Sequence, residues 1–166
     1  MILYVLRHAQ AEDKAEQGGD EARRLTPRGR DKMRSAAAGL RALRLRFDAI
    51  ITSPFARAAE TAEIVAAAYA NDPPPQVLPA LAGGFSPAEA VAALAPFARY
   101  DHLMIVGHQP QLSGMVSLLL SGSSEVVHLD FKKGGCIALE LSNRLERGGA
   151  ELLWMLSQRQ LRKLRK

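Results

Sequence analysis

Two histidines and two arginines stand where they could carry out phosphoryl chemistry. Arg7 and His8 directly follow one short apolar run, His108 follows another, and Arg57 comes shortly after Ser53, which ends a third run. Guanidinium groups bind phosphate oxygens bidentately. A neutral imidazole can attack phosphorus, and a second can stabilise the charge of the transition state. These residues therefore predict a site that binds a phosphoryl group.

The elements that must position these residues can be predicted from apolar patterning. Short apolar runs at 2–6, 48–52 and 102–106 predict buried strands, and segments with helical periodicity lie between them. Strands that alternate with helices indicate an α/β fold, a three-layer sandwich with a largely parallel central sheet flanked by helices. Runs at 136–141 and 151–156 have a short connection, which predicts an antiparallel pair. Because ligands bind beyond the carboxyl ends of parallel strands, the polar residues at the strand ends should meet.

Three helices are predicted to begin at a hydroxyl residue followed by proline. Thr26, Ser53 and Ser86 each precede a proline, which is the usual pairing of an N-cap with the first helical position. Glu89 then adds a negative charge to the first turn of the third helix. The helix after Ser53 would also direct free N–H groups toward a bound anion, so Ser53 is a candidate phosphate-binding residue.

The charge of the chain is concentrated at its C-terminal end. The chain has 166 residues, which predicts one domain, and a net charge of +5. Residues 159–166 hold five basic and no acidic side chains, so the rest of the chain has 17 of each. We therefore expect a domain over 1–158 followed by a basic tail over 159–166. This distribution does not point to nucleic acid as a partner.

The composition also excludes several classes of protein. Cys136 is the single cysteine, which excludes an internal disulfide framework and a multi-cysteine zinc site. The longest apolar run, 91–98, is too short to span a membrane. The N-terminus lacks the basic segment of a signal peptide. We expect a cytoplasmic protein that needs no membrane and no metal.

Four segments resemble the motifs of a known family, in the family's order. Residues 6–12 (LRHAQAE) resemble the Arg-His-Gly signature of the histidine phosphatase superfamily. Residues 52–62 (TSPFARAAETA) and 106–110 (VGHQP) resemble its second and third blocks, and 25–29 (LTPRG) resembles its Leu-Thr-x-x-Gly helix start. The small insertion between the second and third blocks is similar to the phosphohistidine phosphatase branch, the SixA type. The resemblance implies a phosphoglycerate-mutase-like fold.

The resemblance also implies a role for each candidate residue. His8 would be the nucleophile that forms a covalent phosphohistidine, Arg7 and Arg57 would clamp the phosphoryl oxygens, and His108 would complete the pocket. No cofactor is implied. The substrate would be a phosphohistidine-bearing protein, such as a phosphotransfer domain, and the enzyme would act as a monomer.

Two departures from the family pattern bear on the substrate. Ala9 replaces the signature glycine, a change from which we expect little effect. Residues 78–85 lack the acidic residue that phosphoglycerate mutases and many phosphomonoesterases carry there as general acid. An alkoxide leaving group needs a proton in the transition state, whereas imidazole, with a pKa of about 6.5, departs with little help. A site without an acid therefore favours phosphohistidine.

Two alternatives stay open from the sequence. One is a small-molecule phosphomonoesterase that takes its acid from elsewhere, with Glu12 and Glu89 as candidates. The other is a non-catalytic phosphate-binding module, which could bind nucleic acid through the tail.

Overall fold

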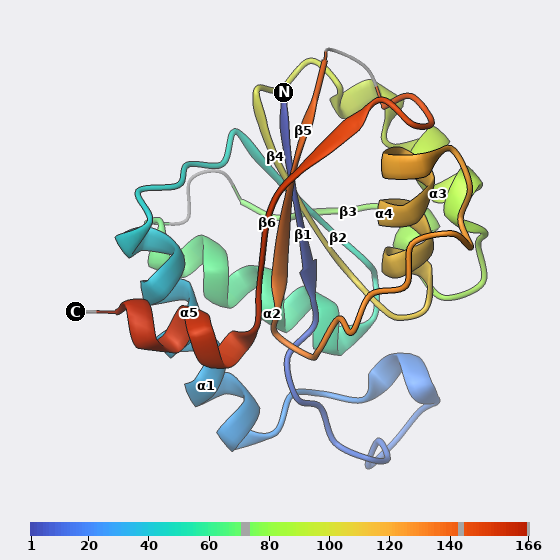
Figure 1. Cartoon of the computed structure of the whole chain (residues 1–166). Coiled ribbons are helices and arrows are strands. Elements are labelled where there is room, and N and C mark those ends of the chain that lie inside the picture. Colours follow the sequence, from blue (N-terminus) through green and yellow to red (C-terminus); the bar gives the residue numbers. More distant parts are fainter. Residues whose placement is uncertain (71–73, 143–144, 166) are drawn as a thin grey trace.

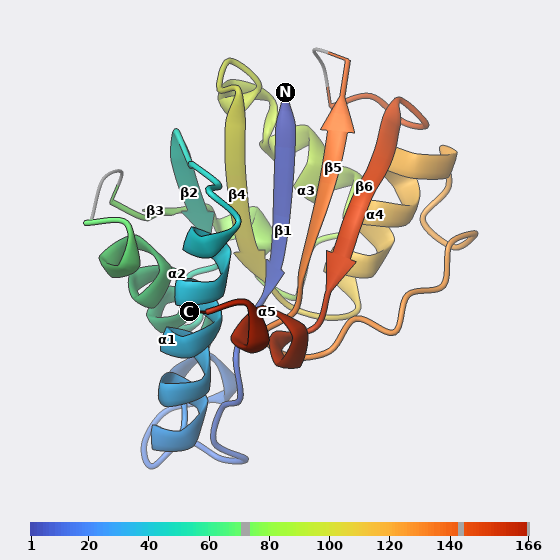
Figure 2. The same ribbon diagram turned by 60° about the vertical axis from the view of Figure 1, so that its left-hand side comes forward.

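The computed structural model describes residues 1–70, 74–142 and 145–165, which form a sheet between two layers of helices (Figures 1 and 2). The sheet has six strands in the order β3-β2-β4-β1-β5-β6. Strands β1 to β4 pair in parallel, β5 runs antiparallel to β1, and β6 runs antiparallel to β5. The strands are β1 (Ile2–Arg7), β2 (Ala49–Thr52), β3 (Gln76–Val77), β4 (His102–Gly107), β5 (Cys136–Leu141) and β6 (Ala150–Leu156). The predicted α/β fold and its antiparallel pair are confirmed.

Alternate residues of the central strands face two separate cores. Leu3 and Val5 of β1 lie in one core, while Tyr4 and Leu6 lie in the other, so β1 is buried on both faces. The first core is closed by α3 (Pro87–Ala93) and α4 (Gln111–Ser121), and the second by α1 (Pro27–Ala42), α2 (Ala56–Ala68) and α5 (Gln158–Leu164). Three short 3₁₀ helices complete the structure: η1 (Asp20–Ala22), η2 (Pro79–Leu81) and η3 (Ala95–Phe97). None of the helices in the described ranges is long and apolar enough to cross a membrane.

Two of the three predicted helix caps are confirmed. The Thr26 hydroxyl accepts the N–H of Gly29, and Ser86 forms a reciprocal capping box with Glu89. The prediction for Ser53 is wrong, because α2 begins at Ala56 and its N-cap residue makes no side-chain hydrogen bond. The Ser53 hydroxyl is instead used inside the candidate site described below.

The C-terminal segment, expected as a basic tail after the domain, forms a helix. Residues Gln158–Leu164 form α5, which begins with a capping box between Ser157 and Gln160 and packs on α1. Leu161 is fully buried, and its carbonyl would lie only 1.9 Å from a Cβ at position 39, so Gly39 permits the close approach of the two helices. The count of charges gave no sign that this basic helix has a buried apolar side chain. Lys166 lies outside the described residues.

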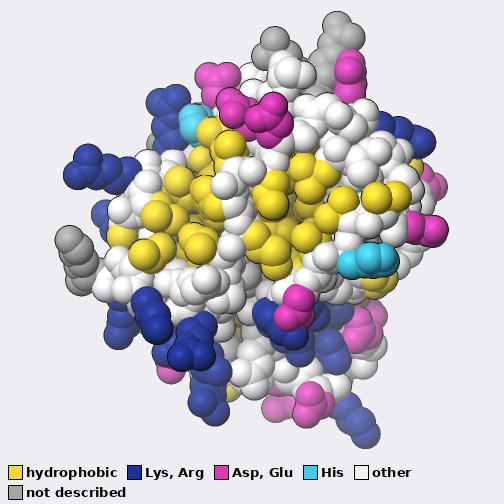
Figure 3. Space-filling view, viewed as in Figure 1, with side chains coloured by type: hydrophobic (Ala, Val, Ile, Leu, Met, Phe, Trp, Pro, Cys, Tyr) yellow, Lys and Arg dark blue, Asp and Glu magenta, His cyan; other side chains and the backbone are white. Residues whose placement is uncertain are grey.

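Figure 3 shows how side chains gather on one face of the molecule. Lysines and arginines gather over α1 and α5, while a band of exposed hydrophobic side chains crosses the middle of this face, where the edge strand β6 passes. Leu152 and Leu153 are both partly exposed, next to a register shift in the β5–β6 ladder. Such a shift is typical of a β-bulge, which bends an edge strand.

Candidate active site

The candidate residues meet beyond the carboxyl ends of three adjacent strands. Arg7 at the end of β1 is in register with Gly107 at the end of β4, and the His8 amide donates to the Gly107 carbonyl at 3.1 Å. The Ser53 amide, after β2, donates to the Val106 carbonyl at 3.0 Å. The parallel ladder therefore fixes the backbone from which these side chains project.

His8 is held as a neutral imidazole with a free ring nitrogen. Its Nδ1 lies 2.7 Å from the Ala9 carbonyl oxygen, which can only accept, so Nδ1 carries the proton and Nε2 keeps its lone pair. Burial lowers the pKa of His8 to about 4; the hydrogen bond to Ala9 opposes this shift, and the charges of Arg57 and Arg7 add to it. A neutral imidazole with a free Nε2 is suited to act as a nucleophile at pH 7.

His108 lies beside His8, with ring centroids 5.1 Å apart. Its Nε2 is 2.7 Å from the Ser53 hydroxyl, which also accepts the Phe55 N–H at 3.3 Å. The hydroxyl proton can therefore be donated to Nε2, and we assign the ring proton to Nδ1 on this network. Burial, followed by the charges of His8 and Arg57, lowers the pKa of His108 to about 3. The Nδ1 atom is buried and has no hydrogen-bond partner among the described residues.

The two arginines also present buried donors. Nη1 of Arg7 donates to the Phe131 carbonyl at 2.7 Å, and both Nη atoms of Arg57 donate to Asp20, at 2.6 and 2.7 Å. In both arginines Nε is buried without a hydrogen-bond partner in the described part of the chain. Buried polar groups are normally satisfied, so unpaired donors on two arginines and on His108 are typical of a site that takes an anion. A phosphoryl group matches them in charge and in number of acceptors.

Helix α2 is bonded to the loop that follows His8. The Thr61 hydroxyl accepts the Ala9 N–H at 3.1 Å and donates to the Arg57 carbonyl at 2.6 Å. One buried side chain thus connects the residue after His8 to the first turn of α2.

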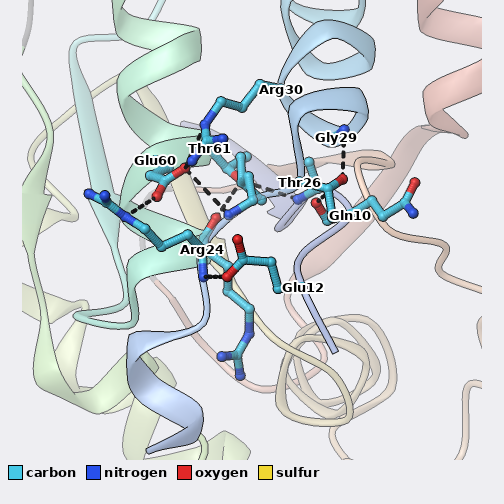
Figure 4. Close-up of polar contacts among 11 residues, drawn as sticks. Gln10, Glu12, Arg24, Thr26, Gly29, Arg30, Glu60 and Thr61 are labelled. Carbon is cyan, nitrogen blue, oxygen red and sulfur yellow. Dashed lines mark hydrogen bonds and ion pairs between the residues drawn. The ribbon is translucent and has the colours of Figure 1, made fainter. Parts of the chain in front are cut away.

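Figure 4 shows the contacts that join the segment after Ala9 to α1 and α2. The Gln10 carbonyl accepts the Thr26 N–H at 3.1 Å, and a Cβ at position 29 would lie only 2.1 Å from that carbonyl. Gly29 is therefore required by this approach, which explains why the Leu-Thr-x-x-Gly segment carries a glycine. Glu60 of α2 forms ion pairs with Arg24 at 2.9 Å and with Arg30 at 2.8 Å (Figure 4).

Both carboxylates considered as general acids are engaged elsewhere. Glu89 is fully exposed and accepts from the amide and hydroxyl of Ser86, at 2.8 and 2.7 Å, and these bonds lower its pKa. Glu12 accepts the Arg24 N–H at 3.3 Å (Figure 4). The Asp20 carboxylate, by contrast, reaches a candidate site residue, because it pairs with Arg57 at 2.7 Å.

Sequence reasoning missed three residues of this site. The Phe55 ring lies 5.0 Å from the His108 ring, and the Arg57 guanidinium carbon lies 5.1 Å from the Phe55 ring centre. Phe55 and Thr61 both lie inside the second motif block, which could have drawn attention to them. Asp20 lies in a polar segment before α1, and no spacing in the sequence connects it to Arg57. Within the described ranges, no three His, Cys, Asp or Glu side chains are grouped to hold a metal ion.

Comparisons with known proteins show what the chain is similar to. The model of the histidine phosphatase superfamily (branch 1) matches residues 3–83. An uncharacterized protein of Picosynechococcus sp. is 40% identical over 144 residues, which cover 84% of each chain.

Solved structures share the fold over nearly the whole chain. The protein histidine phosphatase SixA complexed with tungstate superimposes with a TM-score of 0.83 at 24% identity, covering 97% of this chain and 99% of that one. The alpha-ribazole phosphatase from Shigella flexneri gives a TM-score of 0.74 at 20% identity, with coverages of 95% and 97%. From the matched family model and its fold, the chain belongs to the histidine phosphatase superfamily and is a hydrolase of the phosphatase class.

Proposed function

We propose that the protein hydrolyses the P–N bond of phosphohistidine on a protein, through a phosphorylated His8. The observation that carries this proposal is how the three carboxylates described above are charged and hydrogen-bonded. Asp20 is kept ionised by Arg57, which lowers its pKa, while Glu89 and Glu12 are bonded elsewhere. A site whose nearby carboxylate stays charged suits a leaving group that needs no proton from the enzyme.

In the first step Nε2 of His8 attacks phosphorus in line with the P–N bond of the substrate. The bonding electrons pass to the substrate ring nitrogen. If the other nitrogen of that ring carries a proton, the ring departs as neutral imidazole. The arginine guanidiniums and Nδ1–H of His108 stabilise the equatorial oxygens of the phosphoryl group as it transfers.

In the second step water attacks phosphorus, and the P–N bond to His8 breaks. The hydrogen bond from Nδ1 to the Ala9 carbonyl, 2.7 Å long, keeps a proton on the ring throughout. His8 therefore leaves as neutral imidazole, just as the substrate ring did. The water loses its protons to solvent and to phosphate, and inorganic phosphate is released.

Substrate comparison tests the proposal. A phosphohistidine-bearing phosphotransfer domain and phosphoserine, an alkyl phosphate, are offered to the wild-type enzyme, to His8→Ala and to the control His102→Gln. We expect kcat/KM for the phosphohistidine domain to exceed that for phosphoserine by about 10²-fold or more, the range attributed to general acid catalysis. His8→Ala should be inactive, and His102→Gln should resemble the wild type.

Two outcomes would contradict the proposal. Equal turnover by His8→Ala and wild type would exclude the covalent route. Turnover of phosphoserine as fast as phosphohistidine, and lost in Glu12→Gln or Glu89→Gln, would favour the phosphomonoesterase. A phosphohistidine-bearing partner, a monomeric state and a cytoplasmic location stay predictions from the sequence.

A further inference from the structure

Asp20 accepts two hydrogen bonds from Arg57, one of the two arginines proposed to bind the phosphoryl group. Its backbone carbonyl accepts from Nη1 of Arg57 at 2.6 Å, and its carboxylate accepts from Nη2 at 2.7 Å. The Arg57 side chain is 7% exposed, whereas that of Asp20 is 59% exposed. A residue near the surface thus holds both terminal nitrogens of a buried guanidinium.

The direction of these two hydrogen bonds leaves one edge of the Arg57 guanidinium available. A guanidinium can bind two acceptors through its end, formed by both Nη atoms, or through its side, formed by Nε and one Nη. Asp20 takes the end, and Nε is buried with no hydrogen-bond partner among the described residues. The side edge is therefore the one available to a phosphoryl group.

Asp20 is itself anchored on its far side. Its second carboxylate oxygen lies 3.1 Å from Nε of Arg23, and Nη1 of Arg23 donates to the Asp13 carbonyl at 3.3 Å. The carboxylate is therefore shared between Arg57 and Arg23 and fixed within the segment that contains η1. Arg7, by contrast, donates to a backbone carbonyl, which fixes its position without a countercharge.

We propose that Asp20 is a positioning residue, which holds the end of Arg57 so that the Nε side edge is presented to the phosphoryl group. The inference rests on the proposed function, since it requires Arg57 to bind that group. Misplacing a positioned group by about 1 Å can reduce a rate by roughly 10²-fold. Removal of the Asp20 carboxylate should therefore reduce kcat while leaving the fold intact.

Two substitutions at position 20 separate positioning from a general structural role. Asp20→Ala removes the acceptor for Nη2, and Asp20→Asn keeps an acceptor oxygen without the charge. Asp31, which pairs with Arg34 at 2.9 Å on the exposed face of α1, offers a matched aspartate–arginine pair outside the site. Asp31→Ala and Asp31→Asn are the controls, and Arg57→Ala is the reference for loss of the clamp.

The experiment measures kcat and KM with a phosphohistidine-bearing domain, the dissociation constant for tungstate by calorimetry, and the melting temperature. We expect Asp20→Ala to lower kcat by about 10- to 100-fold and to weaken tungstate binding about tenfold. Asp20→Asn should recover part of both losses. All variants should melt within a few degrees of the wild type.

Three results would overturn the inference. Asp20→Ala could match Asp31→Ala in kcat and in tungstate affinity, or it could bind tungstate more tightly, as expected if Asp20 competed with phosphate. Equal losses in both Asp20 variants, together with a fall in melting temperature, would indicate a structural role. Full activity in Arg57→Ala would instead refute the proposed site, which keeps the two failures distinct.

Discussion

The imidazole rings of His8 and His108 lie with their centroids 5.1 Å apart, at the ends of two strands that pair in parallel. Each ring uses one nitrogen to contact the protein, at the Ala9 carbonyl and the Ser53 hydroxyl respectively. The other nitrogen of each ring is left for the phosphoryl group, as a lone pair on His8 and as a donor on His108. The two histidines therefore have opposite hydrogen-bonding roles in the proposed site.

The first prediction concerns the protonation of these rings. Burial lowers the pKa of His8 to about 4 and that of His108 to about 3, so both should stay neutral well below the ordinary value of about 6.5. NMR titration of the imidazole carbons, assigned with His8→Gln and His108→Gln, should give midpoints below about pH 5. Midpoints near the ordinary value would contradict the buried, neutral pair.

The same shifts predict how stability depends on pH. In the unfolded chain both histidines take up protons near pH 6.5, whereas in the folded chain they do so only near pH 4 and 3. Protons therefore favour the unfolded state below about pH 6.5, and this loss of stability grows until the folded pKa values are reached. Urea denaturation between pH 7.5 and 5 should show a smaller decrease for His8→Gln and His108→Gln than for wild type.

The second prediction concerns the partner of His108. Ser53→Ala removes the hydroxyl that lies 2.7 Å from Nε2, so the ring loses the contact that fixes its orientation and its tautomer. We expect kcat to fall about tenfold, which corresponds to a hydrogen bond of roughly 1.4 kcal/mol. Ser35→Ala, on α1, is the control. An unchanged kcat would show that His108 needs no support from Ser53.

The third prediction concerns the link between α2 and the loop after His8. Thr61→Val keeps the shape of the side chain but removes the bonds to the Ala9 amide and the Arg57 carbonyl. Because the amide of Ala9 is then left without its partner, the free energy of unfolding should fall by about 1–3 kcal/mol. Activity should fall as well, since both His8 and Arg57 are attached to this link. Thr26→Val, which removes a cap of α1, provides a loss of stability outside α2 for comparison.

The fourth prediction concerns the C-terminal helix. Leu161 is fully buried against α1, whereas Leu164 on the same helix is 37% exposed. Leu161→Ala should lower the free energy of unfolding by about 2–5 kcal/mol, the usual cost of a large-to-small core substitution. Leu164→Ala should cost clearly less. Equal effects in urea denaturation would mean that α5 is not part of the cooperative domain.

The sequence predicted the sheet and the residues at its edge because both depend on local patterns. Apolar runs locate the strands, so the residues that directly follow them, such as His8 and His108, could be assigned to one edge of a parallel sheet. Arg57 could be added because a helix was predicted to begin close to Ser53, although α2 begins three residues later, at Ala56. These inferences need only the chain order and the direction of the strands.

Other features could not be predicted, because they depend on contacts between distant segments. Asp20 reaches Arg57 from a polar segment whose path is set by Glu60, Arg24 and Arg30 rather than by any local pattern. Leu161 stands among basic residues in the sequence, and its burial depends on the contact between α5 and α1. The hydroxyl of Ser53 fits an N-cap by pattern, yet a closer partner in another loop takes it.

The bond between His8 and the Ala9 carbonyl has an evolutionary consequence. Every amino acid at position 9 supplies the same main-chain oxygen, so no exchange of side chain there deletes the group that selects the reactive tautomer. The family signature has glycine at this position and this chain has alanine, and both carry that oxygen. In many hydrolases the orienting group of a histidine is a carboxylate, which a single codon change can eliminate. Here the orienting group is part of the main chain, and only a change in the path of the loop could remove it.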